Sequence, residues 1–236
     1  MRSARIGAFA AAIAIAVFLT GCSTLDRIVG ADDWKDWTPD STSIQVSADD
    51  SVTETIFDTL DQSWYEGNEL QDMIARSMNE YNEGHTPGAV NVKSYSDADG
   101  QVKVVIRYQT GDDFSEYNNV MFFAGSILEA QMKGFLFDSP FYVVDGAELS
   151  GGAIDSSEPL SHKEYSVVIS DGTHVVQVPG EIRYVSDGAR LVNSHVATAE
   201  SSEGESVSVP SLYIIYEKDQ EPPLLPSAAE IESGTG

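Results

Sequence analysis

Residues 90–108 read Val-Asn-Val-Lys-Ser-Tyr-Ser-Asp-Ala-Asp-Gly-Gln-Val-Lys-Val-Val-Ile-Arg-Tyr, and apolar side chains recur there with a period of two. Val90 and Val92 begin the pattern, and positions 102, 104, 106 and 108 continue it around Lys103 and Arg107. A period of two places alternate side chains on opposite faces of a β-strand. Between the two halves, Asp97-Ala98-Asp99-Gly100 suits a tight turn. The stretch therefore predicts a β-hairpin.

More strands are expected from residue 135 onward, where short runs rich in valine, isoleucine and tyrosine alternate with turn residues. The expected strands span 141–144, 165–169, 173–178, 182–185, 190–198 and 212–216. Asp-Gly dipeptides at 145–146, 171–172 and 187–188 provide the positive φ angles of tight hairpin turns. Pro179-Gly180 removes a ladder donor and implies an edge, a bulge or a bend. An antiparallel sheet is predicted.

Helices are expected ahead of this sheet and across it. Residues 51–64 combine apolar side chains at four-residue steps with a capping-box spacing of Ser51 and Glu54, although their threonines would also suit a strand. Residues 68–81 carry an apolar stripe between Asn68, a candidate N-cap, and Gly84. Residues 113–131 begin with a second capping-box spacing and are apolar enough to lie across a sheet.

These elements predict an α+β fold with two or three N-terminal helices packed on an antiparallel β-sheet of about five to seven strands. We expect a signal peptide at 1–21, an acidic flexible linker at 22–50, a single globular domain at 51–218 and a disordered tail at 219–236. The linker and the tail are assigned because they are polar, contain proline and lack a sustained apolar period.

The N-terminus has the pattern of an export signal. Arg2 and Arg5 precede an apolar run from Ile6 to Leu19, which is shorter than the roughly 20 residues that a membrane-spanning helix needs. The run ends in Leu19-Thr20-Gly21-Cys22, which resembles the lipobox of bacterial lipoproteins. The resemblance covers residues 1–22 only.

That resemblance implies that Cys22 carries a diacylglycerol thioether and becomes the first residue after cleavage. It also implies a protein held at the bacterial cell membrane through acyl chains and facing the extracytoplasmic side. Cys22 is the only cysteine, so a disulfide within the chain is excluded.

The charge is strongly negative. Removal of residues 1–21 leaves 11 of the 13 basic side chains against all 38 acidic ones, a formal charge of −27. Such a chain is repelled by phosphate backbones, which excludes nucleic acid as a partner. Close carboxylate pairs such as Asp112-Asp113 are expected to be solvated or to cap helices.

Sequence motifs assign no catalytic residue, cofactor or metal. The chain lacks Gly-x-Ser-x-Gly, Ser-x-x-Lys and a Gly-Lys phosphate loop. The Asp-x-Asp-Gly string at 97–100 could begin a calcium loop, but the third oxygen ligand and the distant glutamate of an EF-hand are missing. Two-residue turns at the Asp-Gly dipeptides would set His174 opposite Ile169 and His195 opposite Gly180, so they bring no histidines together.

Two hypotheses follow. The first is a membrane-anchored extracytoplasmic lipoprotein that serves as a non-catalytic binding or envelope-structural module, with a protein, peptide or glycan as its ligand. The alternative is a cell-surface hydrolase that uses Asp or Glu with support from His162, His174 or His195. The alternative requires a concave site with two carboxylates or a histidine-carboxylate pair.

Overall fold

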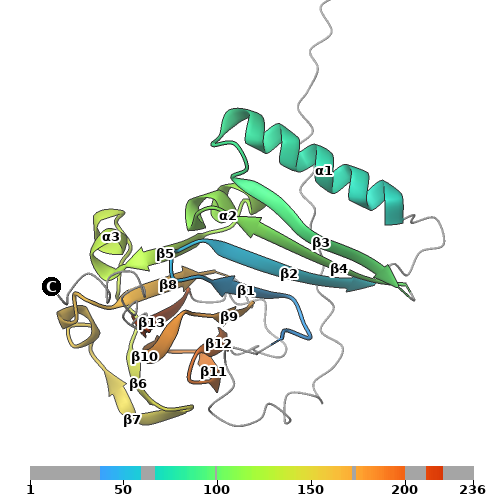
Figure 1. The fold of residues 1–236 in the computed structure, drawn as a ribbon. Coiled ribbons are helices and arrows are strands. Elements are labelled where there is room, and N and C mark those ends of the chain that lie inside the picture. Colours follow the sequence, from blue (N-terminus) through green and yellow to red (C-terminus); the bar gives the residue numbers. More distant parts are fainter. Residues whose placement is uncertain (1–37, 60–66, 99, 172–173, 200–210, 220–236) are drawn as a thin grey trace, which may run out of the picture.

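The computed structural model describes residues 38–59, 67–98, 100–171, 174–199 and 211–219 (Figure 1). These residues form two β-sheets. The first sheet has seven strands in the order β11-β12-β9-β1-β2-β4-β3, and the second has six in the order β5-β8-β13-β10-β6-β7.

The strands of the first sheet are β1 (Ser43–Val46), β2 (Val52–Thr59), β3 (Val90–Ala98), β4 (Gln101–Tyr108), β9 (Val175–Gln177), β11 (Ala189–Asn193) and β12 (Val196–Ala199). Those of the second sheet are β5 (Phe122–Ser126), β6 (Phe141–Asp145), β7 (Glu148–Ile154), β8 (Ser166–Ser170), β10 (Gly180–Ser186) and β13 (Leu212–Lys218). The helices are α1 (Gly67–Gly84), α2 (Gly111–Asn118), α3 (Ile127–Met132) and the 3₁₀ turn η3 (Pro159–Ser161).

The predicted fold class is wrong. The described residues are mostly β and form two sheets, instead of N-terminal helices packed on a single sheet of five to seven strands. Pairing is also not purely antiparallel, because β1 and β9 run parallel. In Figure 1, α1 lies along β3 and β4 at one edge of the first sheet, and α3 lies beside β5 at an edge of the second.

The helix expected at 51–64 is replaced by strand β2 over its described part. The residues that suggested a capping box have other partners: Ser51 Oγ donates to Asp49 Oδ1 at 2.6 Å, and Glu54 Oε2 accepts from the Tyr108 hydroxyl at 2.7 Å. Val52, Thr53, Thr55 and Ile56 are β-branched, which favours a strand once β1 and β4 pair on both sides. The rest of that prediction, residues 60–64, lies outside the described residues.

The linker boundary expected at residue 50 is also too late. Strand β1 pairs with β2 and β9 in the middle of the first sheet, and Ile44 in it is fully buried. The four residues of β1 are too few to show the alternating apolar pattern of a strand in the sequence.

The helix expected at 113–131 is interrupted by strand β5. Helix α2 ends where Asn119 adopts a left-handed conformation, with φ of 53°. Phe122 packs in the interior between the sheets, whereas Phe123 packs on the outer face of the second sheet. Adjacent aromatic side chains can be buried on opposite sides only if the backbone is extended, because alternate residues of a strand face opposite ways. A strand therefore replaces the helix here.

Two other predictions are confirmed. Helix α1 spans the predicted 68–81 stretch and ends at Gly84, although it begins at Gly67, so Asn68 lies inside it. Leu70, Ile74, Met78 and Tyr81 of its apolar stripe pack against the interior core. Strands β3 and β4 form the predicted hairpin, with Ala98 opposite Gln101.

Of the three Asp-Gly dipeptides, the first lies in a hairpin, where Asp145 pairs with Glu148 between β6 and β7. The other two hairpin predictions are wrong. Strand β8 is in the second sheet and β9 in the first, and β10 is in the second sheet and β11 in the first. Pro179 precedes β10 and Gly180 begins it, where the chain passes from β9 in the first sheet to β10 in the second. This agrees with a bend, one of the three alternatives predicted for Pro179-Gly180.

The core has two parts. The interior core joins side chains from both sheets, among them Ile44, Ile106, Ile182 and Ile214. The outer core covers the other face of the second sheet with α3 and neighbouring segments, and it contains Phe123, Ile127, Phe137, Phe141 and Tyr213. All five residues of β8 are buried because both faces of this sheet are covered.

Candidate functional site

A cavity of about 400 Å³ lies between the β1–β2 turn, the start of α2, strand β5 and helix α3. It is lined by Asp49, Asp50, Thr110, Gly111, Asp112, Phe123, Ala124, Gly125, Glu129, Met132 and Lys133. Four of these side chains are carboxylic acids and one is a lysine, while Phe123, Ala124 and Met132 provide apolar surface.

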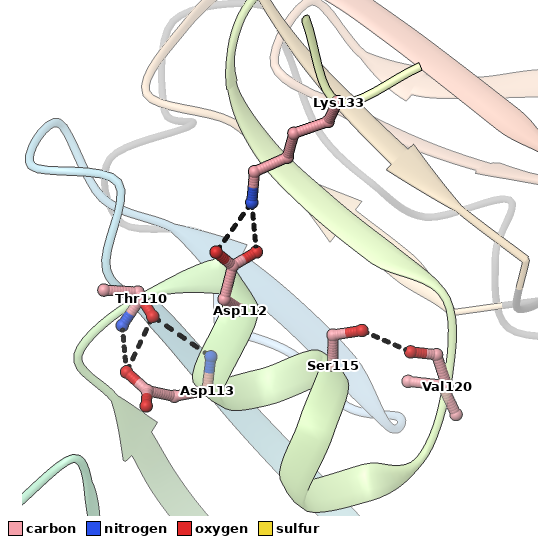
Figure 2. A network of polar contacts seen from close by, with 6 residues as sticks. All are labelled: Thr110, Asp112, Asp113, Ser115, Val120 and Lys133. Carbon is pink, nitrogen blue, oxygen red and sulfur yellow. Dashed lines mark hydrogen bonds and ion pairs between the residues drawn. The ribbon is translucent and has the colours of Figure 1, made fainter. Parts of the chain in front are cut away.

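Helix α2 is positioned by a capping box that begins at Thr110. Thr110 Oγ1 accepts from the Asp113 amide at 3.0 Å, and the Thr110 amide donates to Asp113 Oδ2 at 3.0 Å (Figure 2). The expected box at Asp113 and Glu116 is thus three residues too late, although Asp113 does cap the helix. At the other end, Ser115 Oγ donates to the Val120 carbonyl at 2.5 Å.

Asp112, next to the capping residue, binds Lys133 instead. Figure 2 shows Lys133 reaching toward α2, with its Nζ 2.6 Å from each carboxylate oxygen of Asp112. The same ammonium lies 5.4 Å from the centre of the Phe123 ring. Both side chains of the pair are substantially exposed, so the pair adds about 0–1 kcal/mol to stability. The pair therefore contributes little to holding α3 against α2.

The remaining acids of the cavity are held by short hydrogen bonds. The Ser51 hydroxyl and amide lower the pKa of Asp49, and Arg107 adds a weaker contribution. The Ser126 amide and hydroxyl, which cap α3, lower the pKa of Glu129. Asp50 accepts from Lys218 Nζ at 2.8 Å. Asp49 and Glu129 are therefore ionised at neutral pH, and the lining is negatively charged overall.

A second carboxyl of interest, Glu54, is buried in the interior core and is not part of the cavity lining. Its Oε2 accepts from the Tyr108 hydroxyl at 2.7 Å, and Asn118 Nδ2 donates to that hydroxyl oxygen at 3.1 Å. Burial raises the pKa of Glu54 because the charged form loses its hydration. Glu54 is 7% exposed and has no open face for a ligand, so we expect it to affect the stability of the fold instead of ligand binding.

The structure places the three histidines considered for hydrolysis apart from the cavity. His162 is near Glu164, with Nδ1 3.2 Å from Oε1. Burial lowers the pKa of His174. The predicted pairing of His174 with Ile169 does not occur, because β9 pairs with β1 and β12. The predicted pairing of His195 with Gly180 does not occur either, and the His195 carbonyl accepts from the Val178 amide.

His195 lies between a serine and a carboxylate, with Nδ1 2.9 Å from Ser194 Oγ and Nε2 3.8 Å from Asp219 Oδ1. In serine hydrolases the Nε2 atom faces the nucleophile and Nδ1 faces the carboxylate, so the order here is reversed. Ser194 and His195 are also buried. This arrangement links the β11–β12 turn to the end of β13 and does not present a nucleophile.

Within the described ranges, no group of three or more histidine, cysteine, aspartate or glutamate side chains is placed to hold a metal. None of the described helices has the length and apolar content to cross a bilayer. Cys22, the predicted lipidation site, lies outside the described residues.

Sequence reasoning missed the cavity residues because they come from four separate elements. The pair Asp112-Asp113 was the available signal, and one of its members does cap a helix while the other faces the cavity. Comparisons of the chain with protein-family models, curated proteins and solved structures found no match. The function must therefore be inferred from the site itself.

Proposed function

We propose that this protein is a membrane-anchored extracytoplasmic lipoprotein whose folded part is a non-catalytic binding module, with the acid-lined cavity as its ligand site. One observation carries the proposal: the cavity combines four carboxylic acids and one lysine with an apolar wall. Its volume of about 400 Å³ is within the range of small-ligand sites. The anchor is the acylated Cys22 implied by the lipobox.

The lining defines the chemistry of the ligand. The acidic lining attracts a cationic group of a ligand, and Phe123, Ala124 and Met132 can contact an apolar part of the same ligand. Lys133 occupies Asp112 in the free protein and can exchange for the cation of a ligand, because both partners of this pair are exposed. The ligand is therefore an amine or guanidine with an apolar body, such as a basic side chain of a peptide.

Acid–base catalysis is less well supported. A general acid at neutral pH needs a raised pKa, whereas the pKa values of Asp49 and Glu129 are lowered. The other two acids, Asp50 and Asp112, are each paired with a lysine. The carboxyl with a raised pKa, Glu54, lies outside the cavity lining. The cavity has the two carboxylates that the hydrolase alternative requires, but the lowered pKa values of Asp49 and Glu129 and the lysine partners of Asp50 and Asp112 favour binding over catalysis.

The proposal is tested by titrating the full chain with n-hexylammonium and following backbone amides by NMR. We expect shifts at Ala124, Gly125 and Lys133, which weaken with added salt because the attraction is electrostatic. Hexanoate, with the same hydrocarbon chain and the opposite charge, is the matched control and should leave these amides unchanged. Equal responses to the two compounds, or no response to either, would contradict the proposal.

A further inference from the structure

Exposed apolar side chains lie on and just after α3, and one of them, Met132, also lines the cavity. Among the described residues, five large apolar side chains are exposed: Met73, Leu128, Met132, Leu136 and Leu149. Three of them fall within one short segment, and their exposed fractions are 54% for Leu128, 79% for Met132 and 69% for Leu136. We call these three residues the α3 patch. Clusters of this kind mark interaction sites more often than single exposed residues do.

The backbone that carries the α3 patch is fixed. Ile127 and Ala130, which belong to α3, are fully buried, and Phe137 is 8% exposed. The Tyr213 hydroxyl donates to the Leu136 carbonyl at 2.5 Å, which ties this segment to the second sheet. The patch therefore does not need to be ordered when a partner binds, and little conformational entropy is lost on association.

The α3 patch is continuous with the acidic cavity, because Met132 belongs to both. The combined surface contains the apolar α3 patch and the four acids Asp49, Asp50, Asp112 and Glu129. A complementary partner must present apolar and basic side chains next to each other. That arrangement is the pattern of a basic amphipathic segment.

We propose that the α3 patch and the acidic cavity together form a docking surface for a basic amphipathic polypeptide segment of another protein. The inference rests on the proposed binding function and extends it from a single cationic group to a polypeptide. Charge complementarity selects this occupant. A second copy of the chain would bring the same acids to the interface, and an anionic lipid surface is repelled by a cleaved chain of formal charge −27, from 11 basic and 38 acidic side chains.

The test uses the full chain in a non-ionic detergent and fluorescence anisotropy. The probe is a fluorescein-labelled peptide of about 14 residues, with leucine and lysine at the spacing of an amphipathic helix. Two matched peptides replace either every lysine with glutamate or every leucine with serine. We expect the leucine–lysine peptide to bind at least about tenfold more tightly than either control peptide, with an affinity that falls as salt is added.

The surface is located with Met132→Ser, which should raise the Kd of the leucine–lysine peptide about tenfold. Met73→Ser is the matched control, because it makes the same substitution at another exposed methionine, on α1, and should leave the Kd unchanged. Met132→Leu retains an apolar side chain and should restore binding. Thermal unfolding of each variant verifies that the fold is intact.

Equal Kd values for the Met132→Ser and Met73→Ser variants would overturn the inference, as would equal affinity for the lysine and glutamate peptides. A dimer in sedimentation that disappears in Met132→Ser would also overturn it, since the occupant would then be a second copy. If one of these outcomes occurs while n-hexylammonium still shifts the cavity amides, the inference fails and the cavity remains a ligand site. If n-hexylammonium does not shift these amides in the unmodified chain, the proposed function fails and this inference fails with it.

Discussion

Replacement of Gly180 by alanine tests how closely β10 approaches β13 in the second sheet. Gly180 begins β10 and lies opposite Lys218 of β13. A Cβ atom at this position would lie 2.0 Å from the Glu217 carbonyl oxygen and 2.7 Å from both the Glu217 carbonyl carbon and Lys218 Cα. These are backbone atoms of a paired strand, so they cannot rotate away as the end of a flexible side chain can.

The magnitude follows from this geometry. Adding atoms to a well-packed core costs about 1–3 kcal/mol, and occasionally more. Since the clash is with backbone, we expect the upper end, about 3 kcal/mol in the free energy of unfolding. For a domain of this size each kcal/mol corresponds to about 2–4 °C in Tm, so the Tm should fall by about 6–12 °C.

Urea unfolding of the Gly180→Ala and Gly152→Ala variants provides the assay. Gly152, in β7, is the matched control because no heavy atom lies within 4 Å of a Cβ added there. We expect the control to unfold within about 0.5 kcal/mol of the unmodified chain. If Gly180→Ala also falls within that margin, β10 and β13 do not approach as the structure shows and the reasoning is refuted.

Three further predictions concern ionisable groups and the anchor. Because burial raises the pKa of Glu54, the neutral form favours folding at low pH and this contribution is lost as the pH rises through the folded-state pKa. Glu54→Gln should therefore gain unfolding free energy relative to the unmodified chain as the pH rises above about 4.3 in urea titrations, and a constant difference would contradict the pKa argument. The Tyr81 carbonyl and, more weakly, Glu116 raise the pKa of His85, so its stabilisation is complete below about pH 6.5 and is lost as the pH rises through the folded-state pKa. His85→Ala should cost more stability at about pH 5.5 than at about pH 8.5, and equal losses at both would count against a charged His85. Cys22→Ser should move the protein from the membrane pellet to the soluble fraction, because stable anchoring needs acyl chains; retention in the pellet, or a mature N-terminus elsewhere by mass spectrometry, would disprove the lipid anchor.

Local pattern was sufficient for elements whose side chains face one buried side. The stripe of α1 and the alternation of β4 each match a single buried face, and the structure contains both elements. The Asp145-Gly146 turn was also predictable, because it joins two strands that pair with each other. In these cases the information lies within about 20 residues of sequence, and tertiary contacts reinforce it.

Other local patterns gave the wrong answer because tertiary contacts supplied different partners. Ser51 and Glu54 have the spacing of a capping box, yet Tyr108, distant in sequence, binds the glutamate inside the sheet. From the sequence alone, Phe122 and Phe123 are compatible with an apolar helix. In the structure they are buried in different cores on opposite sides of the second sheet, which requires a strand. Intrinsic preferences differ by only about 1 kcal/mol or less per residue, so burial decides such segments.

The sequence by itself determined the acidic charge, the single cysteine, helix α1 and the β3–β4 hairpin, since each depends on composition or on neighbouring residues. Only the tertiary structure decided which strands belong to which sheet, because Asp187-Gly188 has the same local chemistry whether it closes a hairpin or joins two sheets. The acid-lined cavity is a product of the same long-range packing. Asp49 lies in a turn, Asp112 in the first turn of α2 and Glu129 in a helix cap, and they meet only when the two sheets and α3 come together.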